Sequence, residues 1–317
     1  MRERKLFFAT DLHGSERCFL KFVNAGKFYD VDTLVLGGDV TGKMIVSIVR
    51  QPNGTFESDY LGVKRVLKTT EEVQRLDKTI RDTGYYPYVT DVEEVQKLSS
   101  DPERVRKLFT ELMIKGLERW IKLAEERLGN TGKQMYITGG NDDPLTIEPV
   151  LRSSHFVINP EDKVVQIDEH HEMISSGHSN ITPWHAPRDI PEEELAEKID
   201  KMASQIRDMK NCIFNLHCPP YNSEIDVAPE LDKDLRPVQH RGGVSMIPVG
   251  SRAVRRAIEK YQPILGLHGH IHESAGTYKI NRTLCVNPGS EYAEGILKGV
   301  IVTLNEKGIK SYFFTSG

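Results

Sequence analysis

The stretch YITGGNDDP, residues 136–144, raises the question on which the fold depends. It begins with apolar residues, as a buried strand would, and then passes through two glycines. Asn141, Asp142 and Asp143 follow together and are closed by a proline. Because Asn, Asp and Pro are common turn residues, the simplest interpretation is a tight turn after a strand. The other interpretation gives Asn141 a chemical role, and the rest of the chain bears on that choice.

The composition is that of a globular protein. The chain has 317 residues, of which 38% are hydrophobic and 28% are charged, and we expect one large domain, 1–317, with a sizeable core. The apolar runs are too short for a membrane span or a signal peptide, so we expect no membrane partner and a cytoplasmic location. The four cysteines lack CxxC spacing, which predicts neither a zinc knuckle nor a disulfide framework.

The charge balance bears on the kind of partner. The net charge is −4 and no long run of Lys or Arg occurs, which disfavours nucleic acid, because a basic field supplies most of the affinity for a phosphate backbone. A small phosphorylated substrate held by local positive charge, including a metal, is compatible with this balance. The sequence leaves homo-oligomerisation open.

Short apolar runs predict a layered α/β fold. Between most of these runs lie amphipathic segments of helical period, which is the alternation expected when helices cover a sheet. From residue 277 onward the pattern instead predicts antiparallel strands. The five runs that we predict as buried strands are residues 6–9, 33–36, 135–138, 212–216 and 264–267.

Residues 43–128 interrupt this alternation, and we predict that they form an insertion of a hairpin and helices. Asn53–Gly54 is typical of a two-residue hairpin turn. Thr69 and Glu72 have the spacing of a capping box, which predicts the start of a helix rich in charge. A longer helix is predicted to begin at Asp101–Pro102 and to end near Gly129, with Trp120 in the core.

Polar residues that can bind metals stand just beyond each predicted strand. The carboxyl ends of strands in an open α/β sheet are where ligands bind, so these residues can converge in space. Buried together, they would be costly without a partner, and a divalent metal removes that cost. Three oxygen donors and four imidazoles suit two metals that share one carboxylate, and they are compatible with Mn, Fe or Zn. The seven residues are Asp11, His13, Asp39, Asn141, His217, His268 and His270.

With these motifs in order, the chain resembles the calcineurin-like metallophosphoesterase superfamily. Its signature of DxH, GD, GNH followed by an acidic residue, a further His, and GHxH is matched from residue 9 to about residue 290. The matching motifs are Asp11-Leu12-His13, Gly38-Asp39, Gly140-Asn141-Asp142-Asp143, His217, and LHGHIH at 267–272. In the last motif we match His268 and His270 to the histidine pair and treat His272 as an additional histidine.

The resemblance implies a four-layer fold of two β-sheets sandwiched between helices, with two divalent metals, Mn favoured, at the edge of the sheets. One metal would be held by Asp11, His13 and His270. The other would be held by Asn141, His217 and His268. Asp39 would bridge the two, and Gly139–Gly140 would let the backbone aim the Asn141 side chain.

The activity implied is hydrolysis of phosphate monoesters or diesters, with nucleotides among the candidate substrates, by attack of a metal-bridging hydroxide. Asp39 and Asp142 are the candidate catalytic residues. Asp142 stands where most relatives have His, and its negative charge would repel phosphate unless it carries a proton, orients a metal-bound water or points away. The alternative functions are a non-catalytic metal-dependent nucleotide sensor or scaffold, and a nuclease, which the charge balance disfavours.

A loop at residues 175–191, SSGHSNITPWHAPRDIP, contains the remaining candidates. It is either a packed loop held by its prolines or one wall of a substrate cleft. In the second case, the residues that would bind substrate are His178, Trp184 and His185. The sequence EHH at 169–171 fits a solvated strand end better than a third metal site.

Overall fold

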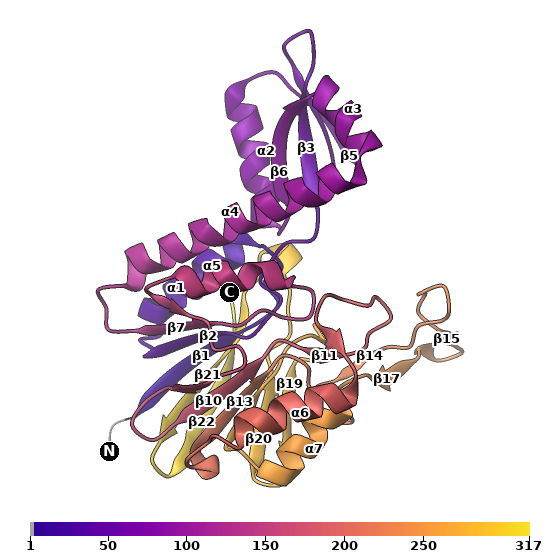
Figure 1. The fold of residues 1–317 in the computed structure, drawn as a ribbon. Coiled ribbons are helices and arrows are strands. Elements are labelled where there is room, and N and C mark those ends of the chain that lie inside the picture. Colours follow the sequence, from indigo (N-terminus) through magenta and orange to yellow (C-terminus); the bar gives the residue numbers. More distant parts are fainter. Residues whose placement is uncertain (1–2) are drawn as a thin grey trace.

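A computed structural model describes residues 3–317 and has two six-stranded sheets packed face to face (Figure 1). The first has the order β22-β21-β1-β2-β7-β8, and the second has the order β19-β20-β18-β13-β10-β9. The strands of the first are β1 (Arg4–Ala9), β2 (Thr33–Leu36), β7 (Gln134–Ile137), β8 (Val157–Ile158), β21 (Lys298–Asn305) and β22 (Gly308–Ser316). Those of the second are β9 (Val164–Gln166), β10 (Glu172–Ser176), β13 (Cys212–Leu216), β18 (Leu265–Leu267), β19 (Gly276–Ile280) and β20 (Thr283–Asn287).

Parallel strands form the centre of both sheets, and the antiparallel pairs, which include β1–β21, lie toward the edges. β1, β2, β7 and β8 run parallel in the first sheet, as do β10, β13, β18 and β20 in the second. The pairs β21–β22 and β19–β20 are antiparallel, which confirms the prediction for the tail. Because parallel strands end at one edge of a sheet, the loops after the inner strands are brought together there.

Three apolar layers explain why these residues form this fold. Leu6, Phe8 and Val35 from the first sheet meet Met173 and Ile213 from the second in the layer between the sheets. The outer face of the first sheet packs against α1 (Glu16–Phe28), α5 (Glu148–Ser153) and the second half of α4 (Pro102–Leu128). The outer face of the second sheet packs against α6 (Glu192–Ala203) and α7 (Arg252–Tyr261). The expected four-layer α/β fold is therefore confirmed.

Residues 45–100 form a separate four-stranded sheet with two helices, which stands above the two large sheets (Figure 1). The predicted hairpin exists, with Gly54 in its turn at φ +84°. The sequence did not predict the other two strands or the parallel pairing of the first and last. The elements are β3 (Ile45–Arg50), β4 (Phe56–Tyr60), β5 (Val63–Leu67), α2 (Thr70–Asp82), β6 (Tyr86–Asp91) and α3 (Val92–Ser100).

The helix α4 links this extra sheet to the core. Asp101 caps its first turn and Pro102 is its first residue, as predicted. Its second half packs on α1, where the Trp120 ring stacks on Phe19 with ring centroids 4.2 Å apart. Trp120 is therefore a core residue. The division into one domain, 1–317, with an insertion at 43–128 stays a prediction, since α4 belongs to both parts.

Short pairings complete the fold. β11 (Ser179–Asn180) pairs with β12 (Asp189–Ile190), and a protruding arm is formed by β14 (Val227–Pro229) with β17 (Met246–Pro248) and β15 (Gln239–His240) with β16 (Gly243–Val244). The single 3-10 turns are η1 (Leu145–Ile147), η2 (Met209–Asn211) and η3 (Tyr292–Glu294). Among residues 3–317, none of the helices combines the length and the apolar character needed to cross a lipid bilayer.

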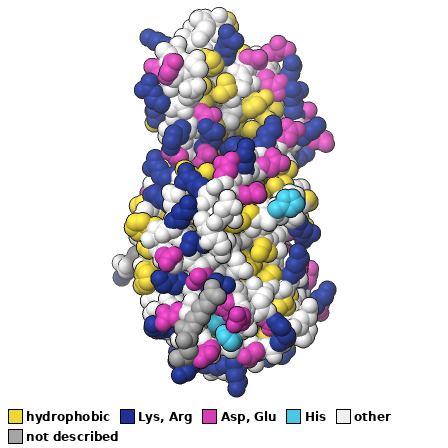
Figure 2. Space-filling model, turned by 90° about the vertical axis from the view of Figure 1, so that its left-hand side faces the viewer, with side chains coloured by type: hydrophobic (Ala, Val, Ile, Leu, Met, Phe, Trp, Pro, Cys, Tyr) yellow, Lys and Arg dark blue, Asp and Glu magenta, His cyan; other side chains and the backbone are white. Residues whose placement is uncertain are grey.

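Charges of both signs are interspersed on the molecular surface seen in Figure 2. Lys and Arg side chains alternate with Asp and Glu over this face, from the extra sheet down to the core. The face therefore shows no separation into a basic and an acidic half.

Candidate metal centre

The candidate residues follow the inner strands, and their backbone is unusual. Asp11, His13, Asp39 and His270 all have positive φ, at +55°, +41°, +48° and +67°. Such values are uncommon for residues other than glycine and cluster at functional sites, where the surrounding structure holds them. Here the loops after β1 and β2 are joined by backbone hydrogen bonds, one of which runs from the His13 N–H to the Asp39 carbonyl at 2.8 Å.

Two glycines allow these loops to approach each other. A Cβ at Gly38 would lie 2.2 Å from Nδ1 of His217, and a Cβ at Gly140 would lie 2.2 Å from Oδ1 of Asp39. Either contact would be impossible for a side chain. The predicted tight turn begins at Gly140, whose carbonyl accepts from the Asp143 N–H at 3.1 Å, and it is close packing, not positive φ, that requires a glycine at this position.

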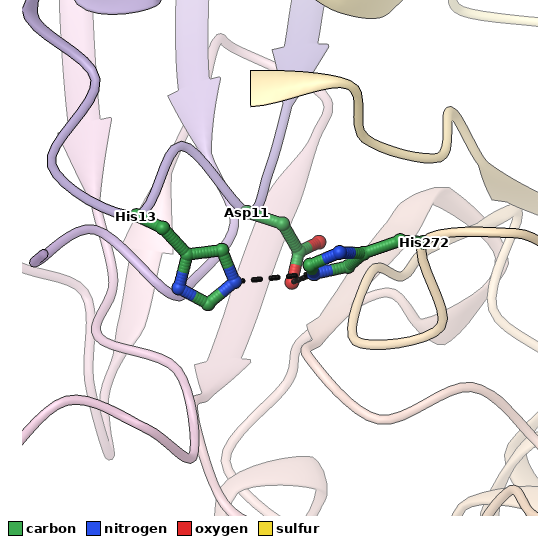
Figure 3. Close-up of side chains that lie close together, drawn as sticks. All are labelled: Asp11, His13 and His272. Carbon is green, nitrogen blue, oxygen red and sulfur yellow. Dashed lines mark hydrogen bonds and ion pairs between the residues drawn. The ribbon is translucent and has the colours of Figure 1, made fainter. Parts of the chain in front are cut away.

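One group of potential ligands consists of Asp11, His13 and His272 (Figure 3). Nε2 of His13 lies 3.1 Å from Nε2 of His272, and the latter atom lies 3.4 Å from Oδ1 of Asp11. Ligand atoms from these three residues all lie within 4.8 Å of one another. This arrangement, with two imidazole nitrogens and a carboxylate oxygen turned toward one point, is what a divalent transition metal requires.

A second group lies beside the first and consists of Asp39, His217 and His270, again with ligand atoms within 4.8 Å of one another. Asp39 stands between the groups. Its Oδ2 is 3.5 Å from Nε2 of His13, and its Oδ1 is 3.5 Å from Nε2 of His217. Nδ1 of His217 faces the Gly37 carbonyl at 3.0 Å, so this ring can donate there and present Nε2 to the centre.

Asn141 reaches the same place with its oxygen unpaired. Its side-chain nitrogen donates to Oδ1 of Asp189 at 3.2 Å, and this bond sets the orientation of the amide. Its Oδ1 is buried and has no hydrogen-bond partner within the described residues. Nε2 of His217 is likewise buried and unpaired among them. A buried polar atom without a partner is costly, so these atoms fit a centre in which a cation supplies the missing partner.

The electrostatics of the cluster are those of a cation site. Burial raises the pKa of Asp39 to about 6, although His217 opposes this. For His217, burial acts to lower the pKa, but the Asp39 and Asp11 carboxylates outweigh it and raise the pKa to about 9. Burial and the charge of His217 lower the pKa of His270 to about 4. The carboxylates thus draw positive charge into a fully buried place, which a metal would supply instead.

The position of His268 corrects our assignment. We expected His268 and His270 as the pair and His272 as additional, but the structure brings His270 and His272 to the cluster. His268 is buried, and its Nδ1 faces the carbonyl of Leu216 at 2.8 Å, on the neighbouring strand. Its Nε2 is unpaired among the described residues but belongs to none of the groups of ligand atoms. The sequence contained the signal, because GHIH at 269–272 matches GHxH when read from its glycine.

Asp142 lies at the rim of the cluster. Its carboxylate forms an ion pair of 2.6 Å with Nζ of Lys43, and its backbone N–H donates to Oδ1 of Asp39 at 3.0 Å. Its carboxylate, His13 and Asp39 form a third group of potential ligands. The side chain therefore does not point away from the cluster, and Lys43, which the sequence did not single out, balances its charge.

Asp143, which the sequence suggests only as a turn residue, organises the loops. It is fully buried, and its carboxylate accepts from the backbone N–H groups of Val40, Thr41 and Gly140, each at 2.8 Å. These bonds tie the loop after β7 to the loop after β2. Only three-dimensional proximity identifies this role, because Asp143 and Val40 are far apart in the sequence.

The loop at 178–190 approaches the centre from the Asn141 side. The Arg188 backbone N–H donates to the Asn141 carbonyl at 3.1 Å. His178 points elsewhere, because its Nδ1 lies 3.2 Å from a Glu161 oxygen. Trp184 and His185 are exposed, and neither has a hydrogen bond or ion pair from its side chain to the cluster within the described residues. Substrate binding by these three residues stays a prediction.

Comparisons with known proteins place this arrangement in context. No family model matches the chain. The uncharacterised protein MJ1162 of Methanocaldococcus jannaschii is 33% identical over 176 residues, which are 55% of this chain and 71% of that protein. A solved structure with 14% identity superposes with a TM-score of 0.57 over 99% of both chains.

Two further solved structures align over nearly the whole chain. TT1561 of Thermus thermophilus, with 12% identity, gives a TM-score of 0.51 over 100% of this chain and 99% of that one. A structure described as a novel archaeal phosphodiesterase, with 13% identity, covers 99% of both chains at a TM-score of 0.35. The likenesses above 0.5 show a shared fold.

Proposed function

The chain belongs to the same family as MJ1162 and has the calcineurin-like metallophosphoesterase fold, and from this premise we propose that it is a metal-dependent hydrolase of phosphate esters. The observation that supports the proposal best is the cluster itself. Three groups of carboxylates and imidazoles, with ligand atoms no more than 4.8 Å apart, lie at the ends of the inner strands. An unpaired, buried Asn141 oxygen completes the set among the described residues.

We assign the ligands from this geometry. Asp11, His13 and His272 would hold one divalent ion. Asn141, His217 and His270 would hold the other, and Asp39 would bridge both, since its two oxygens face opposite groups. Mixed oxygen and nitrogen ligands suit Mn, Fe or Zn, and we retain Mn as the favoured ion. Cytoplasmic location, a small phosphorylated substrate and the absence of a nucleic-acid partner stay predictions.

The roles of the protein groups follow from their positions. When bound, two divalent ions would supply a hydroxide at neutral pH and neutralise charge on the phosphoryl oxygens. Asp39 would set the spacing of the centre. Asp189 would keep the Asn141 oxygen turned inward, and the Gly37 carbonyl would keep His217 in the tautomer that presents Nε2.

Hydrolysis of synthetic esters tests this function. The protein is treated with EDTA, assayed on an aryl phosphomonoester, an aryl phosphodiester and a panel of nucleotides, and assayed again after Mn²⁺ is returned. We expect turnover that disappears with EDTA and reappears with Mn²⁺. Metal binding near two ions per chain, with nucleotide binding but no turnover of any substrate, would instead support the sensor or scaffold.

A further inference from the structure

Lys43 stands at the mouth of the centre, where a substrate would meet it before the buried ligands. Its side chain is 47% exposed and that of its partner Asp142 is 32% exposed, whereas Asp11 is only 1% exposed. The ion pair between them is short, at 2.6 Å. Both residues are therefore accessible from solvent, as is His272 in part, whereas Asp11 beneath them is not.

Asp142 is held against the centre, so it fixes the position of the Lys43 ammonium. Its backbone N–H donates to Oδ1 of Asp39, and one of its carboxylate oxygens lies within 4.8 Å of ligand atoms of His13 and Asp39. A cation 2.6 Å from that carboxylate is thus held beside the metal cluster.

The extra sheet holds the backbone of Lys43 from the other side. The N–H of Gly42 donates to the Tyr86 hydroxyl at 2.8 Å, and Tyr86 begins β6. A Cβ at Gly42 would lie 2.2 Å from the Gly84 carbonyl oxygen. The segment that leads into β3 is therefore packed directly against the segment that leads into β6. Lys43 lies two residues before β3 and is carried by this junction.

The charge of the pair explains how Asp142 can occupy a phosphate site. A lysine side chain is a cation at neutral pH, and here its ammonium lies 2.6 Å from the Asp142 carboxylate. Without Lys43, the Asp142 carboxylate would face an incoming phosphate and repel it. With Lys43, the pair is neutral, and an ammonium is available for a phosphoryl oxygen.

We propose that Lys43 binds a phosphoryl oxygen of the substrate and that Asp142 is the residue that positions it. This inference rests on the proposed function, and it adds a substrate class. A phosphomonoester dianion carries twice the charge of a diester anion, and the attraction to a fixed cation grows with that charge. Lys43 therefore favours phosphomonoesters over diesters.

The test measures inorganic phosphate binding to the Mn²⁺-loaded protein by calorimetry, with metal content determined for each variant. Lys43→Gln should bind phosphate about tenfold to a hundredfold more weakly, as expected for loss of a charged hydrogen bond. Adding Asp142→Asn to that variant should restore only part of the affinity, because the uncompensated carboxylate is removed but the ammonium that binds phosphate is still missing. Lys122→Gln, on the exposed side of α4, is the matched control and should equal wild type.

Several outcomes would overturn the inference. They are wild-type affinity in Lys43→Gln, complete recovery or no recovery in the double variant, loss of metal in Lys43→Gln, or no phosphate binding by the wild type. If the wild type turns over both aryl esters, Lys43→Gln should lose more kcat/KM on the monoester, and equal losses would refute the substrate class. Phosphate binding that depends on Lys43, in a protein without turnover, would reject the proposed hydrolase but support Lys43 as a phosphate-binding residue.

Discussion

His268 and His272 are only four residues apart, and the direction of each side chain decides which of them can bind a metal. His268 is buried against the Leu216 carbonyl of β13, whereas His272 faces Asp11 and His13 (Figure 3). His272→Asn should therefore weaken Mn²⁺ binding by at least about tenfold, a loss seen even when residues behind the ligands are changed. His268→Asn is the matched control, because an amide can replace the Nδ1 contact, and it should retain wild-type metal content by elemental analysis. Loss of metal in His268→Asn but not in His272→Asn would instead identify His268 as the ligand.

The adjacent carboxylates Asp142 and Asp143 predict a second contrast at the same scale. Asp143 is buried and accepts three backbone N–H groups and the Thr41 hydroxyl, whereas Asp142 is partly exposed. Asp143→Asn must leave one of these donors without its charged partner, so it should lower the free energy of unfolding by about 1.5–3 kcal/mol. Asp142→Asn should change it by less than about 1 kcal/mol, as is usual for an exposed pair. Urea denaturation of both variants measures this, and equal effects would contradict the organising role of Asp143.

At the scale of elements, the junction between the extra sheet and the core depends on Gly84. Gly84 and Gly54 both have positive φ, at +91° and +84°, so alanine is strained at either, by about 1–2 kcal/mol. The two glycines differ in the space available for a side chain. A Cβ at Gly84 would lie 2.2 Å from the His13 carbonyl oxygen, whereas a Cβ at Gly54 would meet nothing within 4 Å.

Gly84→Ala should therefore destabilise the protein by about 1–3 kcal/mol more than Gly54→Ala does, because the added methyl group overpacks the junction. It should also weaken Mn²⁺ binding, since the backbone that it displaces carries His13. Thermal unfolding and metal titration of the two variants compare these effects directly. If both variants lose the same stability and keep the same metal affinity, the insertion does not support the centre.

For the whole molecule, the centre joins the two sheets, since its residues come from loops of both. A cation bound there should stabilise the folded chain as a whole. With free Mn²⁺ about a hundredfold above its dissociation constant, the added stability should be about 2.7 kcal/mol, since the unfolded chain lacks the site. Calorimetric unfolding with Mn²⁺ and with EDTA measures the difference. Asp39→Ala, which removes the shared ligand, should abolish most of it, and His268→Asn should retain it; a shift that survives in Asp39→Ala would place the ion elsewhere.

The sequence by itself determined the layered α/β fold and the region of the centre. Apolar runs with a helical or strand period specify which faces are buried, and polar residues just after parallel strands must gather at one edge of the sheet. Asp11, Asp39, Asn141 and His217 could be predicted for that reason. The hairpin at Gly54 and the caps of α2 and α4 could also be predicted, because turns and caps depend on residues close in sequence.

Only the tertiary structure decided what depends on distant parts of the chain. The sequence LHGHIH offers three histidines at a spacing of two residues. The choice between His268 and His272 follows from the contact of His268 with the Leu216 carbonyl of β13 and from the positive φ of His270. The pairing of Lys43 with Asp142 and the burial of Asp143 join residues about a hundred positions apart. No local pattern encodes such contacts, because they arise when two sheets and an insertion pack together and bring their loops to one place.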